Sequence, residues 1–114
     1  MKHILFVCNQ GKNRSKTAAD LLKGNKNVEA KSCGIGELSI HPISLKLLAW
    51  ADLIVVMDKF VEEALRKKYG AACEAKRIIN FNIPDMYDYM TKELVRILKE
   101  KMKRNRIVTK AGVI

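Results

Sequence analysis

Long apolar runs are missing from this sequence of 114 residues. No stretch approaches the roughly 20 apolar residues of a membrane-spanning helix, and the short apolar start "ILFV" lacks the cleavage site of a signal peptide. We therefore expect a cytoplasmic protein without a membrane span. The length suits a single domain over residues 1–114 with one core, and the apolar fraction of 48% is ordinary for a folded chain.

Cysteine is also scarce, with three residues at Cys8, Cys33 and Cys73. An odd number cannot pair completely within one chain, and none of the spacings fits a C-x-x-C metal site. We interpret all three as reduced thiols, as is usual for cytoplasmic proteins. Cys33 and Cys73 are most simply structural.

Acidic residues are few in comparison with basic ones: 12 Asp and Glu stand against 22 Lys and Arg, which gives a net charge of +10. Much of the excess lies between Lys99 and Lys110. A basic surface attracts anions such as phosphorylated molecules or nucleic acid, although a solvated helix end explains this run more simply. Basic and aromatic residues do not interleave as they do in proteins that bind single strands, so nucleic acid is not a favoured partner.

Eight segments have the periodicity of regular secondary structure. Apolar or alternating runs predict strands over residues 2–8, 28–33, 53–57 and 77–82. Apolar residues at helical spacing predict helices over residues 15–23, 43–51, 59–70 and 91–103, the third with Phe60, Ala64 and Leu65 on its buried face and ending on Gly70. Residues 104–114 have no clear period and fit either a loosely ordered tail or a packed end.

The alternation of strands and helices predicts an α/β fold, namely an open sheet of four parallel strands with helices on both faces. Residues 2–8 and 53–57 are the most apolar strands and should be central, which gives the order 2-1-3-4. Ligands of such sheets bind beyond the carboxyl ends of the strands, where the strand order reverses. Cys8 ends the first strand and Asp58 follows the third, so both are expected at this crevice.

Three further residues have simpler interpretations. Asp58 is expected to cap the helix that begins at residue 59. Trp50 ends an apolar helix and is expected in the core. His41 precedes a proline in a loop and lacks partners for a metal site, so we expect an ordinary polar loop residue.

The stretch "CNQGKNRS", from Cys8 to Ser15, joins the first predicted strand to the first predicted helix. A loop in this place points backbone N–H groups inward and has the positive end of the helix dipole behind it, so it can bind an anion. Such a site favours a thiolate at Cys8, and Arg14 adds a planar fork for two phosphate oxygens. Gly11 can supply the positive φ of a tight curl. We interpret the loop as a phosphate site with a reactive thiol, rather than as a polar turn after a buried cysteine.

The sequence "VCNQGKNRSKTAADLL" resembles the phosphate-binding loop of low-molecular-weight protein tyrosine phosphatases, whose pattern is C-x5-R-[ST] after the first strand. The stretch "WADLIVVMDKF" (residues 50–60) resembles the third strand of that family with its Met-Asp ending. The stretch "NIPDMYDYM" (residues 82–90) lies where the family has its acid loop. The similarity covers nearly the whole chain and is closest to a compact branch with an Ile-Pro-Asp-x-Tyr stretch.

The resemblance implies a role for each residue of the site. Cys8 would be the nucleophile, Asp85 the general acid and Tyr87 part of the substrate entrance. Arg14 would clamp the phosphate, and Ser15 would stabilise the thiolate. No metal and no cofactor would be needed. The phosphate oxygens would be held by the backbone N–H groups of the loop residues Asn9, Gln10, Gly11, Lys12, Asn13 and Arg14.

Four departures from the family pattern affect what can be carried over. Gly11 replaces an asparagine whose side chain braces the loop, and Asn13 replaces a second cysteine that forms a protective disulfide. Lys12 stands where an apolar residue often contacts the substrate ring, which weakens the case for phosphotyrosine. Asp85 lacks the proline that usually follows the acid, and Asp88 is the alternative acid.

The sequence therefore favours a cysteine-dependent phosphomonoesterase that acts on a phosphorylated protein, with phosphotyrosine preferred, or on a small aryl phosphate, and that releases inorganic phosphate. Two alternatives remain open. One is an arsenate reductase of the same fold, although its usual pair of closely spaced extra cysteines is missing. The other is a non-catalytic module that binds phosphate or RNA.

Overall fold

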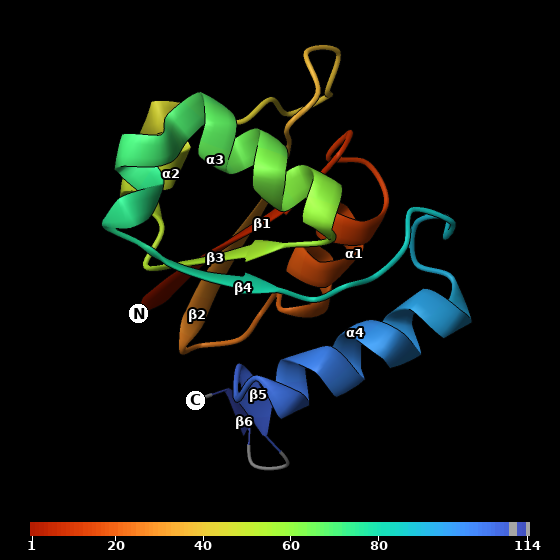
Figure 1. The fold of residues 1–114 in the computed structure, drawn as a ribbon. Helices are drawn as coiled ribbons and strands as arrows, with labels where there is room; N and C mark the ends of the chain where they lie inside the picture. Colours follow the sequence, from red (N-terminus) through yellow and green to blue (C-terminus); the bar gives the residue numbers. More distant parts are fainter. Residues whose placement is uncertain (110–111, 114) are drawn as a thin grey trace.

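A parallel sheet forms the centre of the molecule in the computed structural model, which describes residues 1–109 and 112–113. The order β2-β1-β3-β4 and the parallel pairing of all neighbours confirm the predicted fold (Figure 1). The sheet consists of β1 (Lys2–Cys8), β2 (Val28–Gly34), β3 (Leu53–Val56) and β4 (Arg77–Asn80).

Helices cover both faces of the sheet because the central strands are apolar on both sides. Along β1, Ile4 and Phe6 pack toward one face, where α1 (Arg14–Leu21) and α4 (Lys92–Arg104) lie. Leu5 and Val7 pack toward the other face, under α2 (Leu45–Trp50) and α3 (Lys59–Glu74). The layers are visible in Figure 1.

The third helix differs from the prediction at its end and on its buried face. It runs to Glu74 instead of Gly70, with a kink at Tyr69, because Cys73 still packs into the core below α2 and α3. Val61 is fully buried, whereas Phe60, which was expected on the buried face, is 66% exposed. Leu65 is buried as predicted and Ala64 is half-buried, so the prediction was wrong at Phe60, whose place on the buried face is taken by Val61.

The segments predicted as strands 53–57 and 77–82 remain hydrogen-bonded to each other past the ends of β3 and β4. The N–H of Phe81 donates to Val56, and the N–H of Ile83 donates to Met57. These bonds carry the chain after β4 along the carboxyl edge of the sheet.

Trp50 is half-buried, packs against the core and stacks on His3, while His41 is exposed in its loop.

The chain after α4 begins with a packed turn, in which Ile107 is buried against the core. Two short strands, β5 (Val108–Thr109) and β6 (Gly112–Val113), then pair antiparallel. The remainder of the stretch 104–114, residues 110, 111 and 114, lies outside the described residues. No helix in the described part of the chain is long and apolar enough to span a membrane.

Candidate functional site

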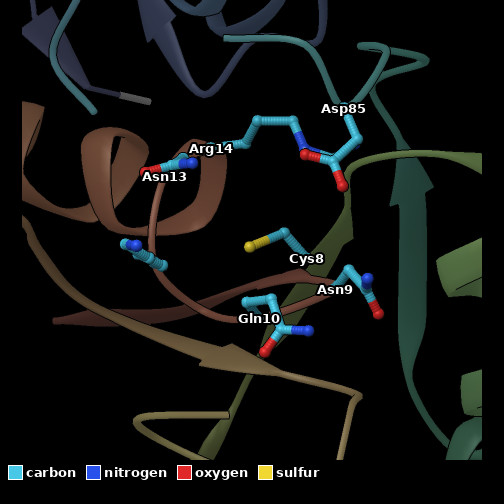
Figure 2. A pocket seen from close by; sticks show the side chains of 7 residues that line it. Cys8, Asn9, Gln10, Asn13, Arg14 and Asp85 are labelled. Atoms are coloured by element: carbon cyan, nitrogen blue, oxygen red, sulfur yellow. The ribbon is translucent and has the colours of Figure 1, made fainter. Parts of the chain in front are cut away.

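A polar cavity of about 220 Å³ opens at the carboxyl edge of the sheet, where β1 passes into α1. Most of its lining comes from the loop after β1, which we call the phosphate loop (residues 8–14), and Asp85 closes it from the opposite side (Figure 2). Cys8 therefore lies where the sheet topology predicts a ligand site. The lining residues are Cys8, Asn9, Gln10, Lys12, Asn13, Arg14 and Asp85.

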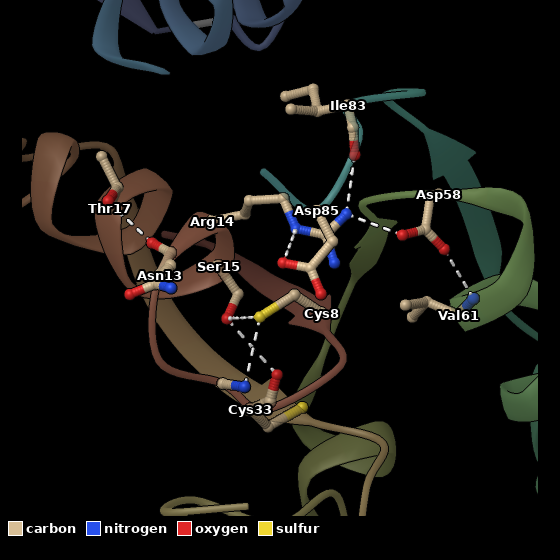
Figure 3. Close-up of polar contacts among 11 residues, drawn as sticks. Cys8, Asn13, Arg14, Ser15, Thr17, Cys33, Asp58, Val61, Ile83 and Asp85 are labelled. Carbon is tan, nitrogen blue, oxygen red and sulfur yellow. Dashed lines mark hydrogen bonds and ion pairs between the residues drawn. The ribbon is translucent and has the colours of Figure 1, made fainter. Parts of the chain in front are cut away.

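The Cys8 thiol is surrounded by hydrogen-bond partners although its side chain is almost completely buried (Figure 3). The N–H of Gly11 donates to Cys8 Sγ over 3.2 Å, and Ser15 Oγ lies 2.9 Å from the same sulfur. Donors aimed at a sulfur stabilise its thiolate form. The geometry agrees with the interaction between Ser15 and the sulfur expected from the sequence.

Arg14 is held in place from three directions while its side chain is only 1% exposed. Its Nη1 donates to Asp58 Oδ2 at 2.7 Å and to the carbonyl of Ile83 at 2.6 Å. Its Nε lies 3.7 Å from Asp85 Oδ1. Nη2 has no hydrogen-bond partner among residues 1–109, so this edge of the guanidinium is available to an anion in the cavity.

Asp58 has two structural roles, of which the sequence predicted one. Its Oδ1 accepts a hydrogen bond from the N–H of Val61 and caps α3, as expected. Its Oδ2 accepts the hydrogen bond from Arg14 and so fixes the guanidinium. The sequence predicted that Asp58 lies at the crevice but not that it binds Arg14. The two residues are 44 positions apart and come together only in the folded chain.

The phosphate loop is braced by the backbone that follows β2. The N–H groups of Ile35 and Gly36 donate to the carbonyls of Cys8 and Asn9, and Ser39 Oγ also donates to Asn9. Gly11 has a φ of +68°, and a Cβ on it would lie 2.8 Å from the nitrogen of Gly34. Glycine at position 11 thus fits a close backbone contact. The loop after β2 braces the phosphate loop in place of the asparagine side chain of the family pattern.

Several backbone donors of the phosphate loop are free. The N–H groups of Gln10, Lys12 and Asn13 make no hydrogen bond within the described residues. Asn13 and Arg14, at the start of α1, line the cavity, so the positive end of the helix also faces it. Free donors at a helix N-terminus form a cradle suited to a phosphate or a similar anion.

The two candidate acids occupy different places. Asp85 lines the cavity beside Arg14, and its side chain is 55% exposed. Asp88 lies outside the lining, and its carbonyl accepts hydrogen bonds from Thr91 at the start of α4. Tyr87 is half-buried and packs against the core beside α1 and α4 rather than among the residues that line the cavity.

After Asp85, the chain is attached to α1 through Tyr89 and Met90. The sequence did not indicate this attachment. The Tyr89 hydroxyl donates to Asp20 Oδ2, and the N–H of Met90 donates to Thr17 Oγ1. Partial burial opposes ionisation of Asp20, but the Tyr89 hydroxyl, Lys16 and Lys23 together lower the pKa of Asp20 to about 2. The bond to Asp20 in turn raises the pKa of Tyr89.

Among known proteins, the similarity of this chain is found in solved structures. No protein-family profile and no curated protein sequence matches the chain. Solved structures do match over nearly their full length. A low-molecular-weight protein tyrosine phosphatase from Streptococcus pyogenes is 15% identical with a TM-score of 0.76, covering 97% of this chain and 96% of its own.

Two further structures agree with this result. Vibrio vulnificus Wzb in complex with benzylphosphonate is 22% identical with a TM-score of 0.71, covering 90% of this chain and 95% of its own. The YwlE arginine phosphatase from Geobacillus stearothermophilus is 19% identical with a TM-score of 0.67, covering 94% of this chain and 96% of its own. The chain therefore has the fold of low-molecular-weight protein tyrosine phosphatases, as the sequence motifs indicated.

Proposed function

We propose that this protein is a cysteine-dependent phosphatase that hydrolyses phosphomonoesters, with phosphotyrosine in proteins as the preferred substrate. The observation that carries the proposal is the Cys8 thiol, which lies at the base of a cradle of free backbone donors in a cavity that Arg14 and Asp85 also line. The structural relatives support it, since two are named for tyrosine or arginine phosphatase activity and a third holds benzylphosphonate.

In the proposed reaction, the Cys8 thiolate attacks phosphorus in line and forms an S–P bond while the P–O bond of the ester breaks. Asp85 gives its proton to the leaving oxygen. The equatorial oxygens accept hydrogen bonds from the loop N–H groups and from the free edge of Arg14. Asp85 then takes a proton from water, the resulting hydroxide attacks phosphorus, and the S–P bond breaks to release inorganic phosphate. Ser15 and the Gly11 N–H stabilise the departing thiolate.

No observation favours the arsenate reductase alternative. Cys33 and Cys73 are both buried on the α2 and α3 side of the sheet. Burial, together with the nearby Cys8 sulfur, raises the pKa of Cys33 to about 12, which makes it a poor nucleophile. No observation favours a phosphate-carrier or RNA-binding module either.

The proposal is tested by phosphate release from phenyl phosphate, p-nitrophenyl phosphate, and phosphotyrosine and phosphoserine peptides. Cys8→Ser should abolish turnover of all four. Asp85→Asn should lower kcat/KM, which reports the first displacement, about 10²-fold on phenyl phosphate, whose leaving group needs a proton, and far less on p-nitrophenyl phosphate. Asp88→Asn is the matched control and should behave like wild type.

Full turnover in Cys8→Ser would exclude the thiolate mechanism. A leaving-group effect that appears in Asp88→Asn and not in Asp85→Asn would assign the acid to the other aspartate.

A further inference from the structure

The chain between β4 and Asp85 follows an edge strand of the sheet. In the order β2-β1-β3-β4, only β3 is hydrogen-bonded to β4. Beyond β4, the N–H groups of Phe81 and Ile83 donate to the end of β3 and to the residue after it. Backbone pairing therefore holds this segment from one side, and its attachment to the rest of the molecule depends on side chains as well.

Asn80, the last residue of β4, uses both ends of its side-chain amide. Its Nδ2 donates to Glu62 Oε1 on α3 over 3.0 Å. Its Oδ1 accepts a hydrogen bond of 2.8 Å from the N–H of Asn82, which has a φ of +52°. Asparagine adopts this left-handed conformation more readily than most residues. The amide of Asn80 thus fixes the turn at Asn82 and ties it to α3.

Glu62 is well suited to accept this hydrogen bond. Its other oxygen, Oε2, accepts from Arg66 Nε over 3.0 Å, and its side chain is 27% exposed. The bond from Asn80, together with Arg66, lowers the pKa of Glu62 against the opposing effect of partial burial. Glu62 is therefore a carboxylate at neutral pH, with one donor on each oxygen, and hydrogen bonds to an ionised acceptor are the stronger ones.

The same glutamate connects the segment to Arg14. Glu62 lies one helical turn from Asp58, and its N–H donates to the carbonyl of Asp58 over 3.0 Å. The Asp58 carboxylate accepts from Arg14 Nη1, and this nitrogen also donates to the carbonyl of Ile83 (Figure 3). The contacts form a closed ring, which runs from Arg14 through the start of α3 to Asn80 and returns through Ile83.

Asp85 is the second residue beyond this ring. Only Pro84 separates it from Ile83, and proline has a restricted φ, so little freedom remains between the two. The Asp85 side chain makes no hydrogen bond within the described residues, and its Oδ1 lies 3.7 Å from Arg14 Nε. The position of its carboxyl group is therefore set mainly by the backbone that carries it.

We propose that Asn80 and Glu62 are positioning residues for Asp85, because the hydrogen bond between them holds the segment 80–83 against α3 and so sets where the carboxyl group stands over the cavity. The inference rests on the proposed function, since the position of Asp85 matters only if it protonates the leaving oxygen. Neither Asn80 nor Glu62 lines the cavity, so both act through the backbone. A general acid has to come within about 3 Å of the oxygen that it protonates, so a small displacement slows this step.

The test exchanges the donor and the acceptor of this bond. Asn80→Asp keeps the acceptor for Asn82 but sets a carboxylate against Glu62, so the bond is lost. We expect kcat/KM to fall about 3- to 10-fold on phenyl phosphate and less than about 2-fold on p-nitrophenyl phosphate. In the double variant Asn80→Asp and Glu62→Gln, the new amide donates to the new carboxylate and its oxygen still faces Arg66. Both rates should then return to within about 2-fold of wild type.

Two further variants separate the bond from charge and from folding. The double variant Asn80→Asp and Glu63→Gln has the same net charge as the exchanged pair, but Glu63 is paired with Lys59 instead of Asn80. It should stay as slow as Asn80→Asp. Glu62→Ala removes the acceptor while Asn80 is unchanged, so it should show the same leaving-group effect even if Asn80→Asp does not fold. Urea unfolding of each variant establishes that it is folded.

An equal loss on both substrates, or no loss on either, would overturn the positioning role. So would an exchanged pair that stays slow, or a rescue by Glu63→Gln that equals the one by Glu62→Gln. A wild-type protein without Cys8-dependent turnover would overturn the proposed function, and the positioning role with it. That failure appears in the wild type, whereas failure of the positioning role alone appears in the ratio of the two substrates among active variants.

Discussion

At the scale of single residues, the site depends on positions where a side chain is absent as much as on those where one is present. Gly11 and Gly34 bring the phosphate loop into backbone contact with the end of β2, and this contact holds the curl around the Cys8 sulfur. A Cβ on Gly34 would lie 2.5 Å from the carbonyl carbon of Gln10, which no side-chain movement can relieve. Both glycines lie outside the predicted strands and helices, and the sequence did not indicate that they face each other, because their contact depends on the pairing of β1 with β2.

Gly34→Ala should therefore displace the phosphate loop. We expect a loss of about 1 to 3 kcal/mol in the free energy of unfolding, as for other overpacked sites. We also expect a fall of at least 10-fold in kcat/KM on p-nitrophenyl phosphate, because donors displaced by a fraction of an ångström no longer match the phosphoryl oxygens. Urea unfolding and steady-state kinetics measure the two effects.

Gly70→Ala is the matched control for this substitution. A Cβ at Gly70, within α3, meets nothing within 4 Å, so the variant should be as stable as wild type or slightly more stable. If Gly34→Ala behaved like Gly70→Ala, the loop contact would not be needed for the site.

At the scale of elements, the loop after β4 is the part that sequence analysis described least well. The "IPDMY" stretch predicted where an acid would stand, and Asp85 does line the cavity. The attachment of this loop to α1 through Tyr89 and Asp20 was not predicted, because it joins side chains 69 residues apart. Strands and helices could be predicted because their signals are local. The burial of Val61 in place of Phe60 was missed because two neighbouring apolar residues at the start of α3 leave open which of them faces the core.

The bond between Tyr89 and Asp20 should position Asp85 for proton transfer. Tyr89→Phe removes it, and we expect kcat/KM to fall about 3- to 10-fold on phenyl phosphate and less on p-nitrophenyl phosphate, since general acid catalysis matters more for the poorer leaving group. A purely structural role would lower both equally. Tyr69→Phe, on α3, is the control and should change neither rate.

The same bond has a defined pH dependence. Because the pKa of Asp20 is lowered to about 2, its contribution to stability is complete above the ordinary value of 3.8 and is lost as the pH falls through 2. The raised pKa of Tyr89 means that the opposite loss begins only above pH 10. Wild type should therefore exceed Tyr89→Phe in stability by a constant amount between about pH 5 and 9, with the difference shrinking in acid. A difference that grew in acid would contradict this account.

At the scale of the whole molecule, the fold brings one loop, one helix start and one acid-bearing segment to the carboxyl edge of a parallel sheet. The order β2-β1-β3-β4 could be predicted from the apolar content of the strands, and the rule for ligand sites in such sheets then predicted that Cys8 and Asp58 lie at the crevice. The network around Arg14, with Asp58 and the Ile83 carbonyl, could not, because it forms only after three strands are in register.

The central claim is that Cys8 carries the phosphoryl group between the two displacement steps. The most direct measurement is mass spectrometry of peptides from Asp85→Asn protein quenched during turnover of p-nitrophenyl phosphate. This leaving group needs little protonation, whereas attack by water loses its base, so the intermediate should accumulate. We predict a phosphoryl adduct on the peptide that contains Cys8, and none in a Cys8→Ser and Asp85→Asn double variant. Turnover with the adduct on another residue, or with no adduct under these conditions, would contradict the account.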